Sequence, residues 1–191
     1  MIIEKRRQTR ETDIVLTLDT EGNGQSKVST GVGFFDHMLE SFAKHAWFDL
    51  TVECEGDTHV DDHHTVEDVG IVLGQALADS IYPIEGVERF GNAVIVMDEA
   101  AVECALDLSN RPYLVYECDV AGKVGTFDVE LAEEFFKAFA FNAGLTMHIV
   151  QRRGRNRHHI VEAAFKSCAV ALRRALVPND RAGVPSTKGV L

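Results

Sequence analysis

The chain has 191 residues, 46% of them hydrophobic and 26% charged, which is the composition of an ordinary globular protein with one domain or two small fused ones. It contains no run of about 18 apolar residues, which excludes a membrane-spanning helix, and its formal net charge of −11 argues against nonspecific nucleic-acid binding. The charged segment 1–10 lacks the apolar core of a secretory signal and the four cysteines form no close pair, so we expect a cytoplasmic protein with reduced thiols.

Hydrophobic periodicity predicts strands and helices in a regular order. Apolar residues alternate at 14–18, recur every three or four residues at 35–46 and form a short run at 48–52, which predicts strand, helix and strand. The further elements are predicted as a helix at 65–81, strands at 93–97 and 102–108, a helix at 131–143, a strand at 145–150 and a helix at 160–176. The segment from 177 onwards contains prolines and glycines and is a predicted loop. This order indicates an α+β protein with helices packed on sheets.

A duplicated motif divides the chain into two related halves. The sequence HHTVE at residues 63–67 recurs as HHIVE at residues 158–162, an offset of 95, and Phe42-Ala43 matches Phe139-Ala140 at an offset of 97. The small change in offset falls in loops, where insertions are tolerated. We predict a first half at residues 1–88, a second half at 89–177 and a C-terminal tail at 178–191.

The repeated motif has the composition of a site for two metal ions. Adjacent residues on a helix point about 100° apart, so His63 and His64 cannot easily bind the same ion. Glu67 lies four residues after His63, on the same helix face, and Glu162 stands in the same relation to His158. Diverging imidazoles in two motifs therefore predict two metals, each with ligands from more than one segment. Nitrogen and carboxylate ligands without thiolate suit manganese, iron or zinc in an open site.

The first helix of each half supplies the remaining candidate ligands. His37 lies near the start of the helix at 35–46, and the residue 97 positions later is Glu134. Both can bind a divalent cation, although a glutamate beside a second glutamate is also what an exposed helix surface contains. His148, on a predicted strand, is a competing ligand or a hydrogen-bonded residue of the core.

Several longer blocks carry a resemblance to a known family. They are GVGFFDHML at 31–39, DDHHTVED at 61–68, MDE at 97–99, SNRP at 109–112 and PSTKGVL at 185–191. Over essentially its whole length the chain resembles imidazoleglycerol-phosphate dehydratase in its single-function form. The resemblance implies an internally duplicated fold of the ribosomal protein S5 domain 2-like type, with helices packed as a bundle between two β-sheets. It also implies two Mn²⁺ ions per active site and a 24-subunit shell of trimers, with active sites at subunit contacts.

The same resemblance assigns roles to individual residues. One metal is implied to bind His37, His64, His158 and Glu162. The other is implied to bind His63, Glu67, His159 and Glu134, a position at which plant-type members have histidine. The residues implied to contact the phosphorylated imidazole substrate are Glu11, His37, Arg89, Arg111, Lys166, Ser186 and Lys188, and those implied to be catalytic are Glu11, His64 and His158. The tail that carries Lys188 is expected to close over the substrate.

The implied reaction is the dehydration of imidazole glycerol phosphate to imidazole acetol phosphate in histidine biosynthesis, via a dimetal-stabilised imidazolate. A neutral imidazole is a poor electron sink, and cations at the two ring nitrogens would stabilise the charge that forms as the hydroxyl leaves. The base is Glu11 or a residue of the metal shell. Two other functions fit the same ligand types: a dimetal hydrolase of a small phosphate or amide, and a metal-nucleated assembly protein.

Overall fold

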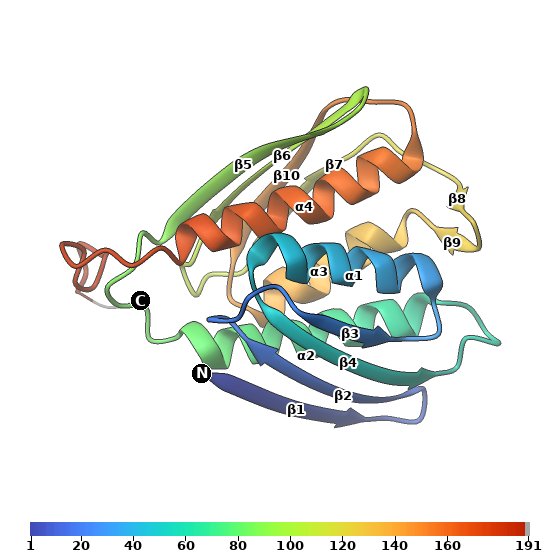
Figure 1. Cartoon of the computed structure of the whole chain (residues 1–191), viewed down its shortest axis with the longest axis horizontal. Coiled ribbons are helices and arrows are strands. Elements are labelled where there is room, and N and C mark those ends of the chain that lie inside the picture. The colour runs from blue at the N-terminus through green and yellow to red at the C-terminus, as the bar shows by residue number, and fades with distance from the viewer. Residues whose placement is uncertain (190–191) are drawn as a thin grey trace.

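Two four-stranded sheets lie on either side of a layer of four helices in the computed structural model, which describes residues 1–189 (Figure 1). The first sheet contains β1 (Ile2–Gln8), β2 (Thr12–Asp19), β3 (Ser26–Ser29) and β4 (Asp49–Gly56). The second contains β5 (Phe90–Met97), β6 (Ala100–Asp107), β7 (Tyr113–Glu117) and β10 (Thr146–Arg153). Between the sheets lie α1 (Gly33–Ala46), α2 (His63–Ile81), α3 (Leu131–Asn142) and α4 (Arg157–Ala175). A small hairpin of β8 (Lys123–Val124) and β9 (Phe127–Asp128) precedes α3.

The two sheets have the same topology. Their strand orders are β1-β2-β4-β3 and β5-β6-β10-β7, and in each sheet the last strand is a parallel edge strand while the other neighbours are antiparallel. The predicted α+β fold, with a repeated unit and helices between two sheets, is confirmed. The boundaries 1–88, 89–177 and 178–191 stay a prediction, and residues 190 and 191 of the tail lie outside the described part of the chain.

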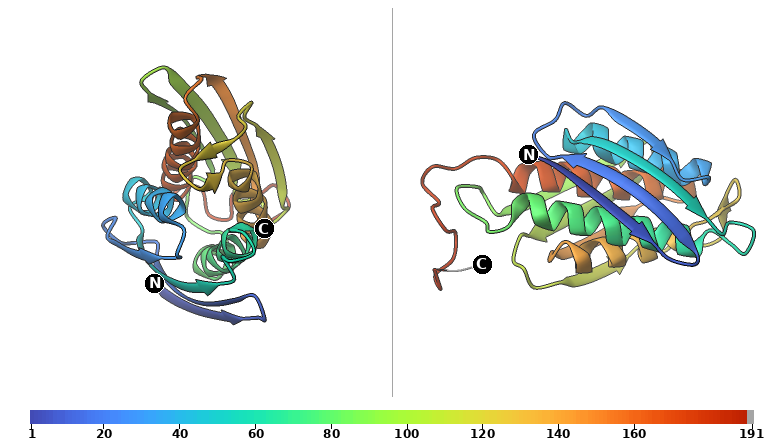
Figure 2. Two further views of the ribbon diagram at one scale, coloured as in Figure 1. Left: turned by 90° about the vertical axis from the view of Figure 1, so that its right-hand side faces the viewer. Right: turned by 90° about the horizontal axis from the view of Figure 1, so that it is seen from below.

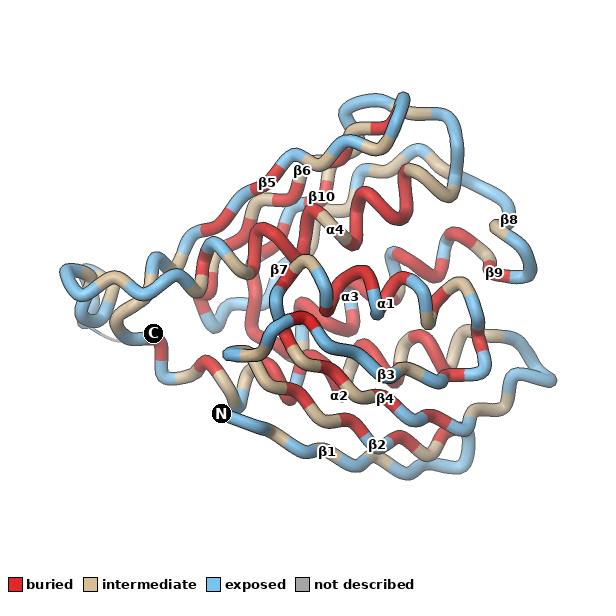
Figure 3. Tube along the Cα trace, in the orientation of Figure 1, coloured by how far each residue is buried: buried red, intermediate tan, exposed pale blue. Residues whose placement is uncertain are grey.

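The core lies where the sheets meet the helices (Figure 3). On β2 the side chains of Ile14, Leu16 and Leu18 are fully buried because they alternate with residues that face away from the helices. On α1 the residues spaced by three and four, among them Phe35 and Phe42, point into the same layer. Burial of this apolar face orients α1. The opposite face of the helix, which carries His37, is exposed.

Helices from different halves pack against each other, α1 on α4 and α2 on α3. Figure 2 shows the four helices enclosed between the two curved sheets. Phenylalanine rings fill the centre of the bundle, and Phe135 lies 5.4 Å from Phe35 and 5.0 Å from Phe165 between ring centroids. The backbones of α2 and α3 approach closely at Gly74, where an added Cβ would lie only 2.6 Å from the carbonyl oxygen of Phe139. The absence of a side chain at Gly74 permits this approach.

Three strands and the β8–β9 hairpin, whose strands have two residues each, were absent from the sequence prediction. On β1 the half-buried positions include Lys5 and Arg7, whose charged ends reach Asp79 and Asp68, so the strand lacks an apolar alternation. The edge strands β3 and β7 are short and pair with β4 and β10 far along the chain.

The segment 177–189 contains no helix or strand, as expected for a loop, and only Pro178 forms an isolated bridge, to Val87. None of the helices in the described residues has the length and hydropathy needed to cross a membrane.

Candidate active site

A cluster of metal-binding side chains lies where α1 packs against α4. His37 of α1 and His158 and Glu162 of α4 each offer one ligand atom, and these atoms all lie within 4.8 Å of one another. Nε2 of His158 is 3.0 Å, and Nε2 of His37 is 3.6 Å, from Oε2 of Glu162. Because Nε2 of both imidazoles converges on one buried carboxylate, this α1/α4 cluster has the donor set of a site for a divalent cation.

The geometry of α4 explains the cluster. His158, Glu162 and Lys166 are spaced by four residues and so share one helix face. Nζ of Lys166 lies 2.7 Å from Oε1 of Glu162, opposite the two imidazoles. Burial raises the pKa of Glu162, but the ion pair with Lys166 and the nearby His37 and His158 outweigh it and lower the pKa below its ordinary value. The carboxylate is therefore held ionised, in the form that binds a cation.

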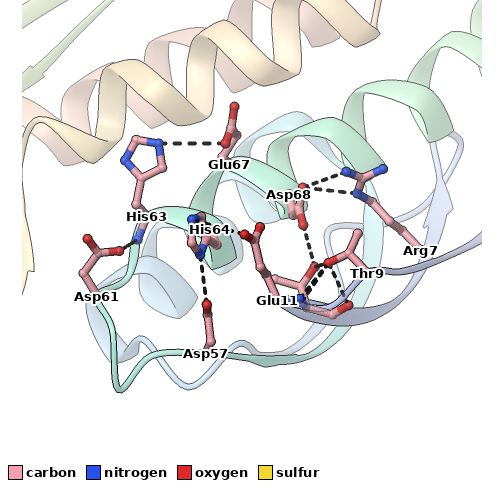
Figure 4. A network of polar contacts seen from close by, with 10 residues as sticks. Arg7, Thr9, Glu11, Asp57, Asp61, His63, His64, Glu67 and Asp68 are labelled. Atoms are coloured by element: carbon pink, nitrogen blue, oxygen red, sulfur yellow. Dashed lines mark hydrogen bonds and ion pairs between the residues drawn. The ribbon is translucent and has the colours of Figure 1, made fainter.

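The motif on α2 is more open. Nε2 of His63 lies 3.8 Å from Oε2 of Glu67 (Figure 4), and both side chains are about half-buried. Glu67 lines a shallow groove between α2 and α3 together with Glu134. The structure thus brings three ligands of the second implied set to one surface, which we call the α2/α3 site.

His64 points in a different direction from His63, since His63 contacts Glu67 whereas His64 contacts residues before α2 in the chain. Its Nδ1 lies 3.0 Å from Oδ2 of Asp57, just after β4, and its Nε2 lies 3.7 Å from Oε1 of Glu11, in the β1–β2 turn (Figure 4). The hydrogen bond to Asp57 raises the pKa of His64 above its ordinary value. The predicted divergence of the two imidazoles is observed, but His64 does not belong to the α1/α4 cluster of its own chain.

His159 has a similar environment in the second half. Its Nδ1 lies 2.8 Å from Oε2 of Glu99, in the β5–β6 turn, and its Nε2 lies 3.9 Å from Oδ2 of Asp98. Oε1 of Glu99 also accepts the backbone N–H groups of Arg155 and Asn156, just before α4. The hydrogen bond from His159 and these two backbone bonds lower the pKa of Glu99 to about 2.

A basic pocket lies at the opposite end of the molecule. It is lined by Arg89, Arg111, Ser186 and Lys188 among others. Arg89 binds Asp107 through two nitrogens, at 2.7 and 3.0 Å, and donates a third hydrogen bond of 2.6 Å to the carbonyl oxygen of Pro185, which fixes the tail beside it. Four of the residues implied to contact the phosphorylated substrate thus meet in one place. Lys166 is not among them, because it lies on α4 beside Glu162.

His148, the competing ligand, belongs to neither site. His148 lies on the exposed face of β10, opposite Met147 and Ile149, whose buried side chains face the core, so it faces away from both clusters. Sequence reasoning found the histidines but missed the carboxylates Asp57 and Glu99 that bind them. A signal was present for Glu99, which belongs to the MDE block at 97–99, whereas Asp57 lies outside the family-like blocks.

The duplicated α+β fold and its imidazole–carboxylate cluster define a protein with a built site for a hard or borderline divalent cation. A family model described as imidazoleglycerol-phosphate dehydratase matches residues 30–172. The chain belongs to the imidazoleglycerol-phosphate dehydratase family. Proteins of that name from Nitratiruptor sp. and Sulfurovum sp. are 67% and 64% identical to it over 190 residues, 100% of this chain and of each relative.

Solved structures agree with this assignment. The crystal structure of imidazoleglycerol-phosphate dehydratase from Staphylococcus aureus is 42% identical, with a TM-score of 0.85, and covers 94% of this chain and 100% of that chain. The enzyme from Pyrococcus furiosus is 40% identical, with a TM-score of 0.85, and covers 98% and 100%. The resemblance seen in the sequence is confirmed, and with it the expectation of a hydro-lyase of histidine biosynthesis.

Proposed function

We propose that this chain removes water from imidazole glycerol phosphate to give imidazole acetol phosphate, with two divalent cations bound to its histidine–glutamate motifs. The observation that carries the proposal is the α1/α4 cluster, in which two imidazoles and a buried, ionised carboxylate converge within 4.8 Å. The relatives named above carry the name of a dehydratase acting on imidazoleglycerol phosphate, and Mn²⁺ suits a nitrogen and oxygen donor set without thiolate.

The fourth ligand of each ion would come from a second copy of the chain. His37, His158 and Glu162 would be completed by His64 of another subunit, and the α2/α3 site by His159 of another subunit. Two observations support this exchange. Each motif keeps one histidine away from its own cluster, and Nε2 of these two residues lies 3.7 Å from Glu11 and 3.9 Å from Asp98, beyond hydrogen-bond distance of either carboxylate. The proposed assembly is the 24-subunit shell of trimers that the family resemblance implies.

The position of the basic pocket also favours shared active sites. Arg89 donates its backbone N–H to Ala175 at the last turn of α4, whereas His158 lies at the first turn. Seventeen residues of helix span about 25 Å, and Figure 1 shows the tail and the start of α4 at opposite ends of the molecule. Imidazole glycerol phosphate, one small ring with a three-carbon chain and a phosphate, is much shorter than this helix and cannot reach both ends of one chain. The phosphate pocket of one subunit would therefore face the metal ligands of a neighbour.

When bound, the two cations supply Lewis acidity that favours the imidazolate form of the substrate ring. The remaining steps fall to side chains of the protein. Arg89, Arg111, Ser186 and Lys188 bind the phosphate, and Lys166 borders the metal end of the site and balances Glu162. Glu11 lies beside Nε2 of His64, so its carboxylate is placed to take the carbon-bound proton. The tail that carries Lys188 excludes water when it closes over the substrate.

The test is an assay of the purified protein with imidazole glycerol phosphate, after chelation and after addition of Mn²⁺, alongside elemental analysis. We expect two ions per chain and a phosphorylated ketone product only in the metal-loaded protein. Release of inorganic phosphate instead of the ketone would identify a hydrolase. Metal binding without turnover would instead support the alternative of a metal-nucleated assembly protein. His64→Gln should abolish turnover and lower the metal content, and full activity with normal metal content would reject its role.

A further inference from the structure

Two of the five histidines in the metal motifs have a carboxylate at Nδ1. Nδ1 of His64 lies 3.0 and 3.2 Å from the two oxygens of Asp57, and Nδ1 of His159 lies 2.8 Å from Glu99. The other three, His37, His63 and His158, approach a glutamate through Nε2. Within residues 1–189, no carboxylate forms a hydrogen bond with Nδ1 of these three histidines.

The hydrogen bond determines the tautomer of each ring. An ionised carboxylate can only accept a hydrogen bond, so Nδ1 of a neutral His64 or His159 must carry the hydrogen. The lone pair is then on Nε2, which is the atom that points away from the carboxylate. In metal sites a histidine ligand commonly donates its other N–H to a carboxylate, which fixes both the tautomer and the orientation of the ring.

The same arrangement is built from different elements in the two halves. Glu99 precedes β6 as Glu11 precedes β2, yet Glu11 approaches Nε2 of His64, whereas Glu99 approaches Nδ1 of His159. The Nδ1 partner in the first half is Asp57, which follows the end of β4. Duplication of one ancestral contact does not produce this pattern. Both halves arrived at an Nδ1 carboxylate by separate routes, which indicates a requirement of the site.

We infer that Asp57 and Glu99 are positioning residues that hold His64 and His159 with the hydrogen on Nδ1, so that Nε2 is directed outwards to a cation in another subunit. This inference rests on the proposed function. Of the five histidines, His64 and His159 are the two that contact none of the other implied metal ligands of their own chain, so a separate carboxylate at Nδ1 is needed to orient them. A ring fixed in advance also loses less side-chain entropy when it binds.

The side chain of Glu99 offers a sharp test. In the Glu99→Gln variant the amide oxygen can still accept from the backbone N–H groups of Arg155 and Asn156, and this leaves the NH₂ group facing Nδ1 of His159. An NH₂ group donates a hydrogen bond, so it favours the tautomer of His159 with the lone pair on Nδ1 and the hydrogen on Nε2. In this tautomer Nε2 has no lone pair with which to bind a cation. Within the described residues, no backbone N–H donates a hydrogen bond to the side chain of Asp57. In Asp57→Asn the amide can therefore turn its oxygen towards Nδ1 of His64 and preserve the tautomer.

The first measurement is long-range ¹H–¹⁵N correlation of the imidazole nitrogens in the metal-free protein, at a pH where the rings are neutral. We expect the Nδ1–H form for His64 and His159 in the wild type and in Asp57→Asn, and the Nε2–H form for His159 in Glu99→Gln. The second measurement is Mn²⁺ titration, in which Glu99→Gln and Asp57→Ala should each lower the affinity of one of the two ions by about 10- to 100-fold.

Matched controls are Glu117→Ala and Glu55→Ala, exposed carboxylates on β7 and β4, which should change neither readout. Unfolding midpoints show that each variant is folded. Unchanged tautomers and Mn²⁺ affinity in Glu99→Gln and Asp57→Ala would overturn the inference while leaving the proposed function intact. A wild type with Nδ1–H histidines that binds no Mn²⁺ would instead overturn the proposed function, and with it the purpose that we assign to these carboxylates.

Discussion

The two copies of the histidine–glutamate motif have the same residues but different surroundings. On α4, Glu162 is 5% exposed and contacts two histidines and Lys166, with His37 contributed by α1. On α2, Glu67 is about half-buried, and its ion pair within residues 1–189 is with His63 at 3.8 Å, while Glu134 lies across the groove on α3. The motif therefore specifies candidate ligands, and the helix that packs beside it decides whether they form a cluster within one chain.

The largest effect is expected at the buried member of this pair. Glu162→Gln removes the only carboxylate of its implied ligand set. Loss of the several kcal/mol by which a bound metal stabilises the transition state corresponds to a decrease in kcat of roughly a thousandfold. Glu67→Gln leaves Glu134 in its set and should reduce Mn²⁺ affinity by less. The measurement is kcat together with metal content, and equal losses in the two variants would contradict the distinction between the two sites.

A second, smaller effect separates the metal end of α4 from the tail end. Lys188→Ala removes a charge-assisted contact to phosphate, worth about 1.5–3 kcal/mol, which raises KM by roughly 10- to 100-fold with little change in metal content. Lys27→Ala, which alters an exposed ion pair with Glu53 on the first sheet, is the control. An unchanged KM in Lys188→Ala would remove this residue from the phosphate pocket.

The third prediction concerns how the helix pairs differ in packing. Gly74→Ala places a methyl group 2.6 Å from the carbonyl oxygen of Phe139, so α2 and α3 must move apart. We expect a loss of about 1–3 kcal/mol in the free energy of unfolding, as is usual for overpacking, measured by urea denaturation. Gly33→Ala, at a position where an added Cβ meets nothing within 4 Å, is the matched control and should be close to neutral. Equal stability of both variants would show that α2 and α3 tolerate separation.

The smallest effect is a pH dependence at the start of β4 in the first sheet. The carboxylate of Asp49 accepts the backbone N–H groups of Gln25 and Asn23, each at 2.8 Å, and these bonds lower its pKa from 3.8. Because the folded-state pKa is the lower one, the contribution to stability is present above pH 3.8 and is lost as the pH falls through the folded-state value.

Asp49→Asn should therefore lower the urea midpoint at neutral pH, and the difference from the wild type should shrink as the pH falls below 3.8. Glu55→Gln, on an exposed side chain of the same strand, is the control. A difference that stays constant with pH would show that the ionised form of Asp49 has no special role in holding the loop before β3.

Elements with an apolar stripe were predictable from the sequence, because burial depends on spacing alone. The helix α1 was identified from Phe35, Met38 and Phe42 in this way. The strand β1 was missed because Lys5 and Arg7 lie partly buried and ion-paired, a placement that depends on acidic residues of α2 elsewhere in the chain. The edge strands β3 and β7 were missed because parallel pairing with a distant strand leaves no local signal.

The candidate site divides in the same way. The repeated motif identified the histidines and glutamates, and helical geometry predicted that neighbouring imidazoles diverge, as His158 and His159 do. The pairs His63–Glu67 and His158–Glu162 followed from their spacing and are observed. The approach of His37 to Glu162 was not predictable, since it follows from the pairing of α1 with α4. The contacts of Asp57 and Glu99 depend on the path of turns, which hydrophobic periodicity does not describe.

The pairing of helices across the halves has a consequence for how the chain can be divided. In the repeat α1 corresponds to α3 and α2 corresponds to α4, so the contacts α1·α4 and α2·α3 are one contact made twice. Reciprocity of this kind is the property of a symmetric dimer. Each half alone would expose the apolar faces of both its helices, and the fused chain carries its own dimer partner. Cutting the connection before β5 would turn one polypeptide into an obligate pair of fragments.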